Sequence, residues 1–223
     1  RSSKNKHAGR PLVFNWTSDH VPAILYTWWL GTKAGDAMAD VLFGDYNPSG
    51  KLPMSFPITE GQIPIYYNHF NTGRPAKDDN DRFYRSAYTD LSLYPKYAFG
   101  YGLSYTTFSY SDITLSTKSP KGAQKLMASV VVTNTGKYDG KETVQLYIRD
   151  MVGSVVRPVK ELKGFQQVFL KAGESKTITF TITTDDLKFY NDSLQYNWEP
   201  GEFQVMIGGS SAAVKPAMVN WSK

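Results

Sequence analysis

Carboxylates are the residues of this chain whose type and spacing come nearest to a catalytic or metal-binding pattern. Asp36 and Asp40 are four residues apart, which would place them one helical turn apart on the same face. Asp78, Asp79 and Asp81 supply the hard oxygen ligands that Ca²⁺ takes, but their spacing does not match an EF-hand loop. We interpret the pair as a solvated helix face and the cluster as solvated loop acids, and we predict no metal site there.

Nucleophilic and phosphate-binding motifs are also missing from the sequence. Ser18, Asp19 and His20 adjoin one another, but they do not make a legible nucleophile–base arrangement. His7, His20 and His69 lack metal-ligand spacing, and no glycine loop is followed by Lys-Ser or Lys-Thr. The sequence therefore predicts no catalytic residue in this chain, no metal and no cofactor.

The best candidate for a functional site is the polar segment from Asn71 to Tyr94. It is long for a loop in a compact domain, and long ordered loops often line sites. Arg85, Tyr88 and Asp90 have side chains of the types that hydrogen-bond to sugars or stack on them. We predict that these three residues bind substrate. Packing between domains is the alternative explanation of the loop.

Composition limits the class of protein. The chain has 223 residues, 41% of them hydrophobic and 20% charged, which fits one large or two modest globular domains. The net charge is +5, with acidic and basic residues interspersed and no long basic helix, so we do not predict nucleic-acid binding. Cysteine is absent, which excludes disulfides and thiolate metal sites. No apolar run reaches about 18 residues, so no membrane-spanning helix is expected.

The first third of the chain reads as part of an α/β layer. Residues 11–16 (PLVFNW) form a continuous apolar run that predicts a buried strand, and residues 21–30 predict a short apolar helix. Apolar residues at helical spacing predict a second helix after Gly31 that stops at Gly44. The turn residues 47–50 (NPSG) then lead into a predicted strand at 52–56. This piece is too small for an independent core, so we expect the chain to be internal to a longer gene product.

From Tyr105 onward the pattern is that of β-structure throughout. Six segments show alternation or β-branched enrichment, and they are 108–116, 126–134, 143–149, 165–170, 176–182 and 203–207. About seven short strands in this length predict a two-sheet sandwich, and the absence of cysteine favours the fibronectin III type over the disulfide-pinned immunoglobulin type. The predicted fold class is thus an α/β segment, part of an α/β sandwich, followed by an all-β fibronectin III-like sandwich. We predict three parts, 1–70 (α/β), 71–103 (linker and loop) and 104–223 (sandwich).

Several long motifs follow one another along the chain. They are DVLFG at 40–44, NPSGKLP at 47–53, YAFGYGLSYT at 97–106, and TNTG at 133–136 with LKGF at 162–165. In this order they resemble motifs of glycoside hydrolase family 3, the β-glucosidase and β-xylosidase family. The resemblance runs from about Gly9 to Gly209. It identifies the chain as the C-terminal portion of such an enzyme, the end of its α/β sandwich domain followed by its fibronectin type III-like domain.

The resemblance implies a retaining, exo-acting β-glycosidase, most simply a β-glucosidase that hydrolyses terminal non-reducing β-D-glucosyl residues. Its catalytic carboxylates would lie outside this chain, which alone would be inactive, and the 71–94 loop would run near the mouth of the active site. The implied partners are the N-terminal catalytic barrel and the rest of the α/β domain, with a β-glucoside or β-xyloside as substrate. Family habit implies a periplasmic or extracellular location.

The sequence is also compatible with a function of a different class. A β-sandwich alone does not define a function, so the chain could be a non-catalytic carbohydrate-binding or adhesion module. The incomplete α/β half discriminates between the two hypotheses, because a free-standing binding module has no need of residues 11–57.

Overall fold

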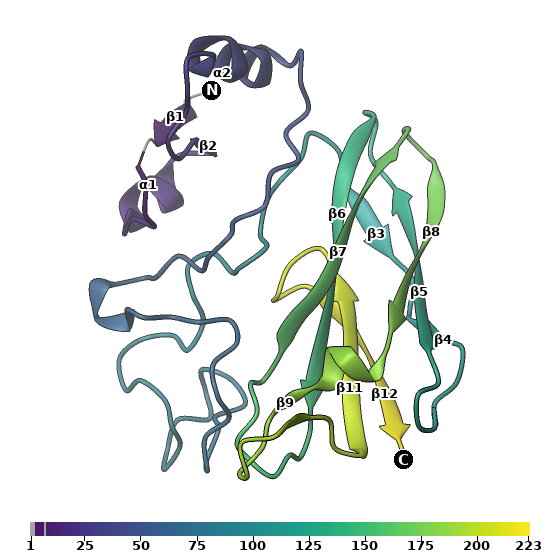
Figure 1. Cartoon of the computed structure of the whole chain (residues 1–223). Helices are drawn as coiled ribbons and strands as arrows, with labels where there is room; N and C mark the ends of the chain where they lie inside the picture. Colours follow the sequence, from purple (N-terminus) through teal and green to yellow (C-terminus); the bar gives the residue numbers. More distant parts are fainter. Residues whose placement is uncertain (1–2, 7) are drawn as a thin grey trace.

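A computed structural model of the chain describes residues 3–6 and 8–223. His7, one of the histidines considered above as a metal ligand, lies outside the described residues. Figure 1 shows a small group of helices and strands near the N-terminus and a β-sandwich that ends at the C-terminus. Irregular segments run beside both, and they contain the predicted site.

The N-terminal group is an α/β segment. Strands β1 (Ser3–Lys6) and β2 (Ala23–Tyr26) pair in parallel, and helix α1 (Asn15–His20) lies between them in the sequence. Helix α2 (Ala34–Phe43) follows, and Gly44 ends it with φ +91°, a left-handed conformation that glycine adopts without steric cost. The helix predicted after Gly31 and its stop at Gly44 are therefore confirmed.

Three predicted elements of this segment are wrong. Residues 11–14 have no regular structure, and Asn15 and Trp16 begin α1 instead of ending a strand. The strand is β2, which lies inside the segment predicted as a helix at 21–30. Residues 23–26 form a strand because they pair with β1. A short apolar run does not by itself distinguish a strand from a helix. Residues 52–56 make only one isolated bridge, between Phe56 and Tyr97.

The sandwich consists of two four-stranded sheets, and it confirms the predicted fold class of an α/β segment followed by an all-β sandwich. One sheet has the order β12-β11-β6-β7, and in the other β5 pairs with β3, β4 and β8. The bounds are β3 (Phe108–Tyr110), β4 (Thr114–Leu115), β5 (Leu126–Asn134), β6 (Gly140–Asp150), β7 (Glu161–Leu170), β8 (Ser175–Ile182), β11 (Gly201–Gly208) and β12 (Val214–Trp221). Two short strands, β9 (Phe189–Tyr190) and β10 (Tyr196–Asn197), form a separate pair, and η1 (Glu60–Gln62) and η2 (Thr184–Leu187) are 3₁₀ turns.

The core lies between the two sheets. Alternate residues of β5 are buried, as a half-buried strand requires, and Val130 and Val132 face Leu146, Ile207 and Trp221 in one apolar cluster. Strand β12 was not predicted from the sequence. Pro216 interrupts its pattern, and the strand tolerates this proline because β12 lies at the edge of its sheet and pairs only with β11.

An irregular segment covers the outer face of the β6-containing sheet. The rings of Tyr67 and Phe99 stack with centres 4.2 Å apart, and both contact the buried ring of Tyr147 on β6. Gln145 Nε2 donates a hydrogen bond to the Gly100 carbonyl at 3.2 Å. Gly100 has φ +78°, and a Cβ there would collide with the Gln145 side chain, so both the turn and the close approach require glycine. This packing fixes the ends of the candidate loop on the sandwich.

Candidate functional site

The loop from Asn71 to Tyr94 is braced from within by its own acidic residues. Asp79 accepts hydrogen bonds from Ser92 Oγ at 2.7 Å and from the Leu93 amide at 2.8 Å. These hydrogen bonds favour the charged carboxylate and hold the pKa of Asp79 below its ordinary value of 3.8. Asp79 therefore has a structural role that the sequence interpretation, a solvated loop acid, did not include.

Asp81 makes similar contacts within the loop. It accepts hydrogen bonds from the Lys77 amide and from Arg85 Nε, both at 3.2 Å, and the amide contact holds its pKa below 3.8. Within residues 3–6 and 8–223, no group of three or more His, Cys, Asp or Glu side chains has the geometry of a metal site.

The loop is anchored to both halves of the chain. Lys96, just beyond its C-terminal end, forms an ion pair with Asp19 of α1 at 2.6 Å. On the opposite side, the Val159 amide of the β6–β7 connection donates a hydrogen bond to the His69 carbonyl at 3.0 Å, next to an isolated bridge between Phe70 and Pro158. A loop held at both ends can present side chains in fixed positions.

The three predicted substrate-binding residues lie on this loop, and they differ in their hydrogen-bond and ion-pair partners. The Arg85 side chain is 40% exposed, and it pairs with Asp81. Tyr88 is 40% exposed, and its carbonyl accepts a weak hydrogen bond from Arg82 at 3.5 Å. Asp90 is exposed and makes no hydrogen bond or ion pair with another described residue. No hydrogen bond or ion pair joins the three side chains within the described residues, so a ligand would have to bring them into one set of interactions.

Sequence reasoning missed two exposed aromatic residues on the same loop. Phe83 and Tyr84 are each 88% exposed, and Tyr84 has a positive φ of 59°. Their signal in the sequence was an aromatic pair within a charged stretch, next to Arg85. Exposed rings of this kind are available for stacking.

The other residues considered for chemistry have separate structural partners. Ser18 Oγ lies 2.5 Å from Tyr97 Oη, and Asp19 pairs with Lys96. His20 Nδ1 contacts the Trp16 carbonyl at 2.8 Å. Because the three side chains have different partners, they do not form a catalytic triplet.

A buried ion pair joins the α/β segment to the sandwich. Lys51 Nζ, from the turn after α2, lies 3.1 Å from the Glu142 carboxylate on β6, and the two side chains are 15% and 6% exposed. Tyr110 Oη donates a hydrogen bond to Glu142 at 2.8 Å, and burial, together with the Glu142 charge, raises the pKa of Tyr110 far above its ordinary value. The pair is a structural link between segments 91 residues apart in the sequence.

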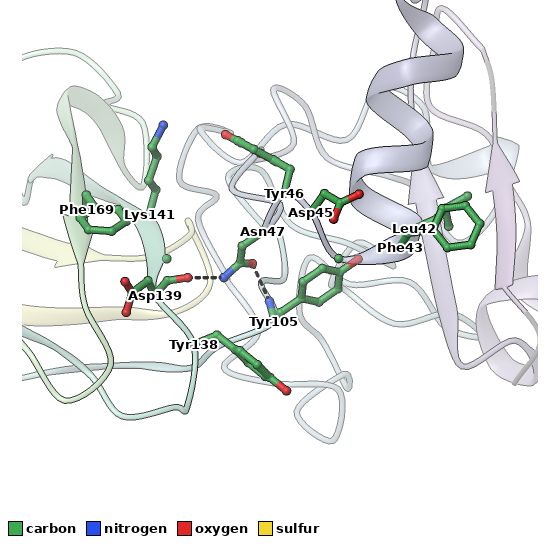
Figure 2. A pocket seen from close by; sticks show the side chains of 12 residues that line it. Leu42, Phe43, Asp45, Tyr46, Asn47, Tyr105, Tyr138, Asp139, Lys141 and Phe169 are labelled. Atoms are coloured by element: carbon green, nitrogen blue, oxygen red, sulfur yellow. Dashed lines mark hydrogen bonds between the residues drawn. The ribbon is translucent and has the colours of Figure 1, made fainter.

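A crevice of about 1020 Å³ opens beside this link, between the end of α2 and the edge of the sandwich. Figure 2 shows Leu42 and Phe43 near the helix on one side, Lys141 and Phe169 on the strands of the other, and Asn47 between them. Aromatic rings and charged groups both line it. No residue of the 71–94 loop contributes to this lining.

Comparisons with known proteins cover nearly the whole chain. Residues 6–105 match the model of the glycosyl hydrolase family 3 C-terminal domain, and residues 142–211 match that of the fibronectin type III-like domain. A periplasmic β-glucosidase of Salmonella typhimurium is 54% identical over 93% of this chain, and a β-xylosidase of Formosa agariphila is 45% identical over 92%. The crystal structure of a β-glucosidase from Listeria innocua, in complex with isofagomine, superposes with a TM-score of 0.94 at 43% identity over 99% of this chain.

These relatives are much longer than the chain, which covers 27% of each of the two enzymes compared by sequence and 31% of the Listeria structure. None of the helices in the described residues is long and apolar enough to cross a membrane. Both family matches, in the same order as the two halves of the fold, lead to one conclusion. The chain belongs to glycosyl hydrolase family 3, and it carries the C-terminal domain of that family followed by a fibronectin type III-like domain.

Proposed function

We propose that this chain is the C-terminal part of a retaining, exo-acting β-glycosidase that hydrolyses terminal non-reducing β-D-glucosyl residues. The observation that supports this best is the similarity of both halves, over 99% of the chain, to a β-glucosidase of known structure. The Salmonella relative, also a β-glucosidase, supports the same substrate class and a periplasmic or extracellular location. A non-catalytic binding or adhesion module is not favoured. The α/β half, and not only the sandwich, matches a domain found in the enzyme family.

In this proposal the chain borders the active site and supports it. A retaining mechanism needs two carboxyl groups about 5 Å apart, one as nucleophile and one as acid/base. We assign both to the catalytic barrel and the remaining α/β domain of the longer gene product, which are the partners of this chain. We also propose that the α/β part ends near residue 70 and the linker near residue 103.

The contribution of the 71–94 loop is to bind the sugar with Arg85, Tyr88 and Asp90. Its internal bracing by Asp79 and Asp81 supports this role, because a preorganised loop loses little conformational entropy when substrate binds. The guanidinium and the carboxylate would hydrogen-bond to hydroxyl groups, and the tyrosine ring would contact an apolar face of the sugar.

Kinetics of the longer gene product on an aryl β-glucoside test the proposal. We expect hydrolysis by the longer protein and none by the 223-residue chain. Asp90→Asn and Arg85→Ala should each raise KM about ten-fold, since a hydrogen bond to a charged group contributes about 1.5–3 kcal/mol.

Asp36→Asn is the matched control, because Asp36 is exposed on α2 and pairs only with Lys33 in the described structure. Its kinetic constants should equal those of the wild type. An inactive longer protein would contradict the proposed enzyme. Loop variants that behave like the Asp36 control would contradict the substrate-binding role alone.

A further inference from the structure

The crevice between α2 and the sandwich has a rigid floor. Asn47 Nδ2 donates to the Asp139 carbonyl, and Asn47 Oδ1 accepts from the Tyr105 amide, both at 2.8 Å (Figure 2). Ser104 Oγ donates to the same oxygen at 2.8 Å. Tyr105 Oη in turn donates to the Val41 carbonyl in the last turn of α2. The two sides of the crevice are therefore joined by hydrogen bonds, and its width is set by the fold.

Three aromatic rings that line this crevice remain exposed. Tyr46 and Phe169 are each 46% exposed, and Tyr138 is 63% exposed. Lys141 Nζ lies 5.9 Å from the centre of the Tyr46 ring and makes a cation–π contact with one of its faces. Exposed apolar surface gathered in a hollow, in contrast to single rings scattered over a protein, marks a binding site.

The charged groups beside the rings indicate what kind of ligand fits. Asp45 and Asp139 supply carboxylates and Lys141 supplies an ammonium group along the same crevice. Asp139 Oδ1 accepts a hydrogen bond from the Ala172 amide at 2.9 Å, whereas Asp45 makes no hydrogen bond or ion pair within the described residues. A polyanion would be repelled by the two carboxylates. A neutral ligand with many hydroxyl groups can both donate to the carboxylates and accept from the ammonium group.

We propose that this crevice binds a neutral oligosaccharide, with sugar rings stacked on Tyr138 and Phe169 and hydroxyl groups bonded to Asp45 and Lys141. The volume of about 1020 Å³ is at the upper end for small-molecule pockets and suits several sugar units. The inference goes beyond the proposed function, because it assigns binding to residues outside the 71–94 loop and requires no hydrolysis.

Calorimetric titration of the 223-residue chain with cellohexaose tests the proposal. The wild type should bind, and the double variant Tyr138→Ala and Phe169→Ser should bind about ten-fold more weakly, because each stacked ring stabilises a complex modestly. Both rings are solvent-exposed, so far-ultraviolet circular dichroism should be unchanged. Tyr190→Ala is the matched control, since that ring is 66% exposed on β9 and lies outside the crevice lining. Its affinity should equal that of the wild type.

Three outcomes would overturn the proposal. They are no binding by the wild-type chain, equal affinity in the double variant, and binding of polygalacturonate as tight as that of cellohexaose. An aryl β-glucoside assay of the longer gene product, run beside the titration of the 223-residue chain, separates the two ideas. If the crevice variants lose affinity for cellohexaose while hydrolysis fails, only the proposed function is contradicted. If hydrolysis is intact while the crevice variants bind as the wild type does, only this inference is contradicted.

Discussion

Lys51 and Glu142 show how one buried pair can hold two halves of a chain together. Lys51 Nζ also donates a hydrogen bond to the Gly102 carbonyl at 3.1 Å, at the point where the irregular segment returns to the sandwich. Removing one partner of a buried pair leaves the other charge uncompensated, which costs more than the net stabilisation from the pair.

We therefore predict that Lys51→Met lowers the free energy of unfolding by about 3–5 kcal/mol. Glu142→Gln should have a similar effect. In the double variant the free energy of unfolding should fall by less than the sum of the two single losses. Urea denaturation followed by tryptophan fluorescence measures all three. Lys33→Met is the control, because the Lys33–Asp36 pair is 86% and 70% exposed, and it should change stability by less than about 0.5 kcal/mol. Strict additivity of the two buried substitutions would contradict the coupling.

At the scale of elements, the 71–94 loop depends on the charge of its acids. Because the pKa of Asp79 lies below its ordinary value of 3.8, its ionisation stabilises the loop above about pH 4. That contribution is lost as the pH falls through the lowered pKa. Ionisation of Asp150, at the end of β6, has the opposite effect on stability. Burial raises its pKa, so its ionisation opposes folding as the pH rises from 3.8 towards the raised value.

Amide chemical shifts can follow both carboxylates over the pH range in which the fold stays intact. The Leu93 amide, which donates to Asp79, should titrate with a midpoint below 3.8, and the Val152 amide, which donates to Asp150 at 3.3 Å, with a midpoint above it. Asp79→Asn should abolish the Leu93 titration and leave that of Val152 unchanged. A common midpoint for the two amides would show that the contacts do not perturb these carboxylates.

The elements differ in how far local sequence predicts them. Alternation in β5 and β8 and the helical pattern with its Gly44 stop at the end of α2 predict structure correctly, because the residues that form each pattern are close in sequence. Strand β2 and the Phe56–Tyr97 bridge depend on partners elsewhere in the chain, and local patterns carry no information about those partners.

At the scale of the whole molecule, α2 is left open to solvent by the described part of the chain. None of its residues is buried, and Gly35, Asp36 and Ala37 in its first turn are exposed. A helix of 10 residues is marginally stable without tertiary packing. On the proposal that the rest of the α/β domain covers this face, amide exchange in α2 should be slower in the longer gene product than in the 223-residue chain.

Hydrogen exchange followed by mass spectrometry measures this difference for each peptide. Strand β6 serves as an internal reference, because it pairs on both sides within the sandwich and should be equally protected in the two proteins. Equal protection of α2 in both would mean that this face stays uncovered in the longer protein.

Local patterns in the sequence predict the order of an α/β segment and a β-sandwich and the resemblance to the family, and they mark a loop whose role in binding stays a prediction. Periodicity and motifs are local properties, so they need no coordinates. The folded chain alone shows that Lys51 pairs with Glu142, that Asp79 and Asp81 brace the loop, and that the end of α2 and the sandwich edge enclose a crevice. These features require residues distant in sequence to pack together, and such contacts exist only once the chain has folded.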